Sequence, residues 1–180
     1  LDIKEAQFLI VSAEVDASGF IHAIMKQIEE KVKAFRIVCF KENNSAEDAA
    51  ENFDSEMEAL LPELQKRKEQ HEKGELSEKE YPYIIILIED MESCFEKVSN
   101  ETMRRLNNIV IMGQELNIIL FAAAKTDELK DLYHRGEMFT INLVKSAASV
   151  LIGGTVQNHE VFKTNLKHNA SITPLEKGEA

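Results

Sequence analysis

The stretch FLIVSAEVDASGF, residues 8–20, decides the fold, because it reads as a buried strand, a turn and the first residues of a helix. Four consecutive apolar residues at 8–11 are typical of a strand that is covered on both faces. Asp16 and Ser18 are residue types that often cap the start of a helix. Many α/β proteins hold a nucleotide phosphate at such a junction. The first question is therefore whether this turn binds phosphate.

Outside this stretch, four more apolar runs resemble buried strands: RIVCF (36–40), YIIILI (83–88), NIILFAAA (117–124) and SVLIGG (149–154). Helical patterns lie between most of the runs: 18–34, 45–73 with Pro62 expected to kink or divide it, 99–115 and 127–134. We expect a further extended segment at 137–144 and a final helical turn or two at 159–166. Strands that alternate with helices predict an α/β fold in which a mainly parallel sheet lies between two helical layers.

The chain has 180 residues, 44% of them apolar, which suits one globular domain spanning 1–180. It contains no apolar stretch of about 18 residues, and its start lacks the pattern of a signal peptide. The abrupt start close to a strand suggests a piece of a longer protein. Cys39 and Cys94 match no metal or redox spacing, so we interpret them as small apolar residues in a reducing compartment.

The net charge is −11, and residues 42–80 hold 13 acidic and 5 basic side chains. Binding to nucleic acid depends on clustered lysine and arginine, which this chain lacks, so we expect no nucleic-acid partner. Within 45–73 the first half is acidic and the second half basic, an order that complements the helix dipole. We interpret these charges as a solvent-exposed helix face.

The turn departs from the phosphate-binding pattern G-x-x-x-x-G-K-[ST] at every defined position. Ser12 and Ala17 stand in place of the glycines, Ser18 in place of the lysine, and Gly19 in place of the hydroxyl residue. The next lysine, Lys26, lies about 12 Å further along the helix. Phosphate therefore has no lysine partner here.

Two acidic side chains, Glu14 and Asp16, also lie in the turn, against about half a positive charge from the helix N-terminus. Their field repels a polyphosphate. We predict a vestigial nucleotide site that binds ATP weakly or not at all, made of Ser12, Ala13, Glu14, Asp16, Ala17, Ser18 and Gly19.

A second candidate site follows the strand at 83–88. Nucleotide hydrolases place an aspartate there for the magnesium shell and a glutamate for the attacking water. Here the order is reversed, Glu89 and then Asp90, so both side-chain lengths are changed. At the end of the next strand, where a polar residue would sense the γ-phosphate, Ala122 and Ala123 have no polar group. We predict a vestigial pair at 89–90, a vestigial sensor, no catalytic residue and no metal site.

Several segments together resemble the FtsK/SpoIIIE-type ring ATPases, whose fold is a RecA-like P-loop NTPase fold. These are PYIIILIED, the helix ending RRLNNIVIMGQELNI, the strand ILFAAAK, the earlier helix EMEALLPELQKRKEQ, and SVLIGG followed by HEVF. The order and spacing of these segments cover nearly the whole chain. Within the family, the damaged turn and the acidic composition look most like the C-terminal ATPase-like modules of the membrane-bound coupling proteins of type VII secretion.

This resemblance implies a module on the cytoplasmic side of the membrane that recognises secreted substrates of the Esx (WXG) type or regulates an upstream motor. Neighbouring ATPase modules of the same chain and a ring of the parent protein are the other implied partners. Two alternatives stay open. One is an atypical active ATPase that uses Glu89 and Asp90, and the other is a DNA translocase module, which the charge distribution opposes.

Overall fold

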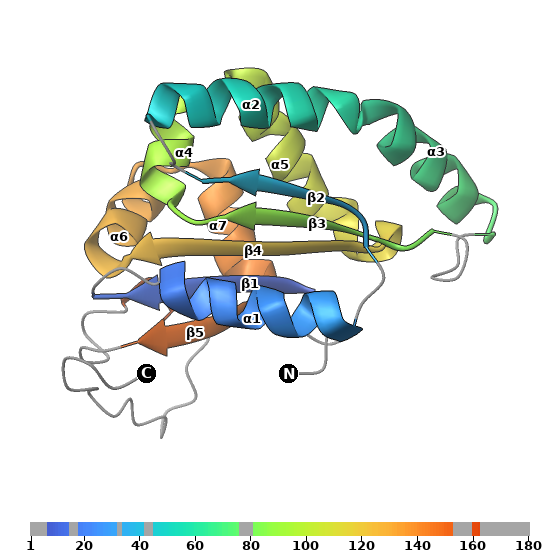
Figure 1. Cartoon of the computed structure of the whole chain (residues 1–180). Coiled ribbons are helices and arrows are strands. Elements are labelled where there is room, and N and C mark those ends of the chain that lie inside the picture. Colours follow the sequence, from blue (N-terminus) through green and yellow to red (C-terminus); the bar gives the residue numbers. More distant parts are fainter. Residues whose placement is uncertain are drawn as a thin grey trace.

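The computed structural model describes residues 7–14, 18–31, 34–41, 45–75, 81–152 and 160–162. A five-stranded parallel sheet forms its centre, in the order β2-β3-β4-β1-β5 (Figure 1). The strands are β1 (Phe8–Ala13), β2 (Ala34–Phe40), β3 (Tyr83–Ile88), β4 (Ile118–Lys125) and β5 (Ala148–Ile152). The predicted α/β fold with a mainly parallel sheet is confirmed.

Helices cover both faces of the sheet (Figure 1). One face packs against α1 (Ser18–Lys31), through Ile21, Met25 and Ile28. The other face is covered by α2 (Ala46–Ala59), α4 (Met91–Lys97), α5 (Asn100–Met112), α6 (Thr126–His134) and α7 (Met138–Ser146). The elements α3 (Leu61–Glu72), η1 (Gly113–Leu116) and η2 (Glu160–Phe162) complete the description. The three αβα layers expected from the sequence are therefore present.

Successive side chains along the central strands point to opposite faces of the sheet, so the core consists of two clusters, one on each face. In β4, for example, Leu120 and Ala122 face the layer of α2, α4 and α5, whereas Phe121 and Ala123 face α1. All of these side chains are buried. Side chains buried on both faces explain why the strands read as continuous apolar runs.

The predicted division at Pro62 is confirmed, and serine hydroxyls cap α2 and α5. The long helical pattern is two helices, α2 and α3, and Pro62 lies in the first turn of α3, where its missing N–H is tolerated. The Ser45 hydroxyl accepts the Asp48 N–H at 3.1 Å, and the Ser99 hydroxyl accepts the Thr102 N–H at 3.2 Å. Among the described residues, no helix has the length and apolar character needed to cross a membrane.

Two helices differ from the sequence-based expectations. Residues 137–144, expected to be extended, form most of α7, and α4 was not predicted. The β-branched residues of 138–146 favour a strand, but Phe139, Thr140, Leu143 and Val144 share one buried helix face. In the 159–166 segment, 160–162 form a 3₁₀ turn, and 159 and 163–166 lie outside the described residues, as do the glycines at 153–154.

The basic half of the 45–73 segment is not uniformly exposed, because Arg67 is fully buried. Its guanidinium donates to the backbone oxygens of Pro82, Leu116 and Asn117 at 2.6, 3.1 and 3.2 Å, and its Nε lies 2.7 Å from Glu63 Oε1. The interpretation of a solvent-exposed face was wrong at this position. Arg67 joins α3 to the chain entering β3 and to the end of η1.

The two cysteines are free thiols, and they differ in exposure. Cys94 is buried in α4, as expected of a small apolar residue, whereas Cys39 in β2 is partly exposed. Burial, with a smaller contribution from the Glu89 carboxylate, raises the pKa of Cys39 to about 11. A thiol with so high a pKa holds almost no thiolate at neutral pH and is a poor nucleophile.

Candidate functional site: the carboxyl edge of the sheet and a groove between two helices

The end of β1, where a phosphate-binding loop would begin, continues the sheet. Ser12 and Ala13 are fully buried, and Ala13 pairs with Lys125 of β4 and Ile152 of β5. The Ser12 hydroxyl donates to Thr126 Oγ1 at 3.4 Å. The Glu14 N–H donates to the Ile152 carbonyl at 3.2 Å. This amide therefore serves strand pairing, whereas a phosphate-binding loop turns its amides toward the ligand.

The rest of the predicted turn is described only at its end. Asp16 and Ala17 lie outside the described residues. Ser18 and Gly19 are the first two residues of α1. Apart from its own helix and chain neighbours, no atom of the described residues lies within 4 Å of where a Cβ on Gly19 would be, so none of those residues demands glycine here.

Glu89, directly after β3, is surrounded by basic groups from two other elements. Its Oε1 lies 2.7 Å from His22 Nε2 of α1 and 3.6 Å from Lys41 Nζ, which follows β2. The Lys41 Nζ and His22 Nε2 are 3.1 Å apart. Glu89 Oε1 is shielded from solvent and has no aligned hydrogen-bond donor among the described residues, so the compensation is mainly electrostatic. The carboxylate in the metal-shell position thus has Lys41 as an internal cationic partner and faces the imidazole of His22.

Asp90 is the N-cap of α4. Its Oδ1 accepts the Ser93 N–H at 3.0 Å, and its Oδ2 accepts the Ser93 hydroxyl at 3.1 Å. Both carboxylate oxygens are therefore used to start a helix. A general base needs a free oxygen within reach of the attacking water.

The capping role predicts how substitutions at Asp90 differ. Asp90→Ala is expected to lower the free energy of unfolding by about 1 kcal/mol, because the first turn of α4 loses its acceptor. Asp90→Asn is expected to change it by only a few tenths, because asparagine caps helices about equally well. Urea unfolding of the two variants and the parent chain measures this difference. Equal destabilisation by alanine and asparagine would contradict a capping role.

The predicted sensor positions are part of the core. Ala122 and Ala123 are buried in β4, where Ala122 pairs with Ile10 and Ile88. The first exposed polar side chain on this strand is Lys125, which sequence analysis did not single out. The only signal for it was its position directly after the alanine run.

Carboxylates surround Lys125. Its Nζ lies 2.5 Å from Glu128 Oε1, and this hydrogen bond raises the pKa of Lys125. Burial raises the pKa of Glu92, and the nearby Glu128 carboxylate adds to that rise. Within the ranges that the structure describes, no three His, Cys, Asp or Glu side chains are arranged to hold a metal ion. The lysine at the end of β4 is thus paired with an acidic neighbour.

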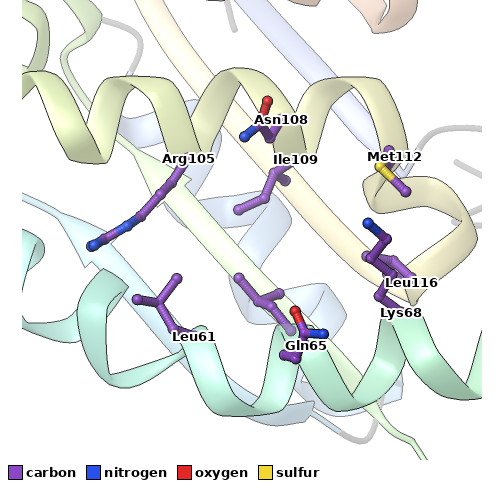
Figure 2. Close-up of a pocket in the computed structure, with 9 residues that line it drawn as sticks. Leu61, Gln65, Lys68, Arg105, Asn108, Ile109, Met112 and Leu116 are labelled. Carbon is purple, nitrogen blue, oxygen red and sulfur yellow. The ribbon is translucent and has the colours of Figure 1, made fainter.

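A second feature, an open groove of about 360 Å³, lies between α3 and α5 (Figure 2). Its apolar lining consists of Leu61, Leu64, Ile109, Met112 and Leu116. Its polar lining consists of Gln65, Lys68, Arg105 and Asn108. We refer to these nine residues as the α3/α5 groove. Arg67 fixes one wall, because it ties α3 to the carbonyl of Leu116.

Comparison with solved structures shows which proteins share this architecture. The cytoplasmic domain of EssC superposes with a TM-score of 0.68 at 11% identity, over 97% of this chain and 35% of that one. EssC ATPases 2 and 3 from Geobacillus thermodenitrificans give 0.71 at 11% identity, over 97% and 34%. The chain has the fold of the EssC ATPase domains. The similarity confirms the P-loop NTPase-like fold expected from the FtsK/SpoIIIE resemblance.

Two structures from Thermomonospora curvata also share this fold. The cytoplasmic domain of its type VII secretion ATPase EccC gives a TM-score of 0.55 at 15% identity, over 99% of this chain and 22% of that one. EccC ATPases 2 and 3 in complex with a signal sequence peptide give 0.52 at 14% identity, over 97% and 34%. The present chain spans about a third or less of each of these chains. No family model and no curated protein matches its sequence.

Proposed function

We propose that this chain is a non-catalytic or weakly active ATPase-like module of a type VII secretion motor, which recognises export substrates or regulates export. The observation that carries the proposal is the state of the two carboxylates after β3. Asp90 caps α4 with both oxygens, and Glu89 faces His22 and Lys41. These partners compete with a magnesium shell and with an attacking water for the two carboxylates, which supports a non-catalytic or weakly active module.

The residues at the ends of β1 and β4, on the same carboxyl edge of the sheet, support the same function. The lysine of a phosphate-binding loop is missing, and the Glu14 amide is used by β5. Lys125, the nearest substitute after β4, is bound to Glu128. A triphosphate would meet two carboxylates of the turn, Glu14 and Asp16, and Lys125 would have to exchange its ion pair with Glu128 for one with the phosphate.

The proposed partners follow from the fold neighbours, which are chains with several ATPase domains. One of them is in complex with a signal sequence peptide, which supports recognition of a secreted substrate as a role for this fold. We therefore propose Esx (WXG)-type substrates and neighbouring ATPase modules, in a ring of the parent protein, as partners. The proposed location is the cytoplasmic side of the membrane, as one module of a longer anchored chain. Nucleic acid is not a proposed partner, because of the −11 charge.

Calorimetric titration of the chain with MgATP tests the proposal, with an ATPase that has an intact phosphate-binding loop as the positive control. We expect a Kd weaker than about 1 mM, which is less than about 4 kcal/mol of binding free energy, and no phosphate release. Micromolar binding that Glu89→Gln abolishes would overturn the proposal in favour of an atypical ATPase. A shift of duplex DNA that weakens with salt would instead support a translocase module.

A further inference from the structure

The α3/α5 groove differs in charge from the rest of this acidic chain. The chain has 32 acidic and 21 basic residues, yet the groove lining contains two cations, Lys68 and Arg105, and no acidic residue. Its remaining polar residues, Gln65 and Asn108, are uncharged. The nearest carboxylates lie at the margin of the groove, where Glu101 is 3.4 Å from the Arg105 Nε and Glu69 accepts a hydrogen bond from Gln65 at 3.1 Å. A partner that enters the groove would meet the two cations of the lining itself.

The two cations lie at opposite ends of the groove. Figure 2 shows Arg105 of α5 near Leu61 of α3 at one end, and Lys68 of α3 near Met112 of α5 at the other. Leu61 and Lys68 are separated by seven positions on α3, as are Arg105 and Met112 on α5. Seven residues span about 10 Å along a helix. The two cations are therefore carried at positions about two helical turns apart along the groove, with Leu64 and Ile109 at intermediate positions on the two helices.

Arg105 is also incompletely paired. Its side chain is 17% exposed, and its Nε lies 3.4 Å from Glu101 Oε1. This Nε is shielded from solvent and has no aligned acceptor among the described residues. Because this Nε is shielded, a carboxylate brought into the groove would meet the terminal guanidinium nitrogens of Arg105 instead, and charge-assisted hydrogen bonds are the stronger kind.

We propose that the α3/α5 groove is a docking site for an amphipathic helix that carries two carboxylates two turns apart, with apolar side chains between them. Helix-in-groove recognition uses apolar anchors at positions i+3 and i+4, and here Glu or Asp at i and i+7 meets Arg105 and Lys68. The inference deepens the proposed function and rests on it, since it names the chemistry of the segment that the module recognises. Charge at the two ends fixes the register, and the apolar centre supplies contact area.

A pair of labelled peptides tests this site on the intact 180-residue chain by fluorescence anisotropy. Each peptide has about 15 residues, long enough to form some helix, with leucine at i+3 and i+4. One carries glutamate at i and i+7, and the other carries glutamine there. We expect the glutamate peptide to bind roughly tenfold more tightly at low salt, and the difference to shrink as salt is raised.

Charge-reversed variants localise the binding. Lys68→Glu and Arg105→Glu are each expected to weaken binding of the glutamate peptide roughly tenfold. Lys26→Glu is the matched control, because Lys26 is exposed on α1, on the other face of the sheet, and the change in net charge is the same. Lys68 is exposed, so its variant stays informative even if Arg105→Glu unfolds.

Three results would overturn the groove proposal: no binding of the glutamate peptide, equal binding of both peptides, or equal loss in Lys68→Glu and Lys26→Glu. A dimer of the chain that Lys68→Glu dissociates would also overturn it, in favour of a second copy as the occupant. These outcomes are independent of the MgATP titration. Tight ATP binding would refute the proposed function, whereas failure of the peptides alone would refute only the groove.

Discussion

Arg67→Ala is expected to lower the free energy of unfolding by about 3–5 kcal/mol, because it breaks a buried charge network by removing one partner. The Arg67 side chain is fully buried. It donates hydrogen bonds to the carbonyls of Pro82, Leu116 and Asn117 and to the carboxylate of Glu63. Alanine removes this donor from the Pro82 and Leu116 carbonyls, whereas the Asn117 carbonyl still accepts the Ile84 N–H at 3.1 Å. Each buried acceptor without a partner costs about 1–3 kcal/mol.

Urea unfolding followed by circular dichroism measures this effect. The matched control is Lys68→Ala on the same helix, where the side chain is exposed and a change within about 0.5 kcal/mol is expected. Arg67→Lys keeps the charge but loses the planar fork, so it should fall between the parent and alanine. If Arg67→Ala were as stable as Lys68→Ala, the network would not hold α3 against the sheet.

The second large effect is expected at Phe121, in the middle of β4. Its ring is fully buried, and in the sheet it lies beside Leu9 of β1 and Leu87 of β3. Among the described elements, α1 is the helix that covers this face, through Ile21, Met25 and Ile28. Phe121→Ala leaves a cavity beneath that helix and is expected to lower the free energy of unfolding by about 3–5 kcal/mol.

The conservative control at this site is Phe121→Leu, which retains most of the volume and is expected to cost about 1.5 kcal/mol or less. Ala123, two residues further along, faces the same helix. Ala123→Gly removes only one methyl group there, so its effect should also be much smaller than that of Phe121→Ala. Similar losses for leucine and alanine at 121 would show that the site collapses without leaving a cavity.

Much of the architecture could be predicted because it depends on local patterns. The strands are buried on both faces, so their apolar runs are visible without knowledge of their neighbours. The division at Pro62 follows from its missing N–H and fixed φ, and the Ser45 and Ser99 caps follow from side-chain oxygens at helix starts.

The misassigned elements depend on contacts between distant segments. Residues 138–146 contain β-branched residues at a spacing that fits either element, and packing against α5 favours the helix, as the 2.8 Å hydrogen bond from Asn142 to Asn107 illustrates. The burial of Arg67 likewise depends on carbonyls that lie 15 to 50 residues away in the chain. A run of charged residues gives no sign of which member turns inward.

The candidate site could be predicted only in part from the sequence, for the same reason. The reversed order of Glu89 and Asp90 is visible in the sequence, but the partners of Glu89 come from α1 and from the end of β2. Asp90 stands three residues before Ser93 at the start of a helix that was not predicted, so its capping role was missed. The α3/α5 groove needs both walls to be placed before its charge pattern can be recognised.

The strand order also affects how the protein is made. β1, near the start of the chain, lies between β4 and β5, so Phe8 pairs with Leu120, and Leu9 with Ala148. During synthesis β1 therefore lacks both of these neighbours until β4, more than 100 residues further along the chain, has been made. Strand pairings between residues so distant in sequence have a high entropic cost of loop closure, and this cost slows folding. Until then FLIV at 8–11 is an unpaired apolar segment, the kind that holdase chaperones bind.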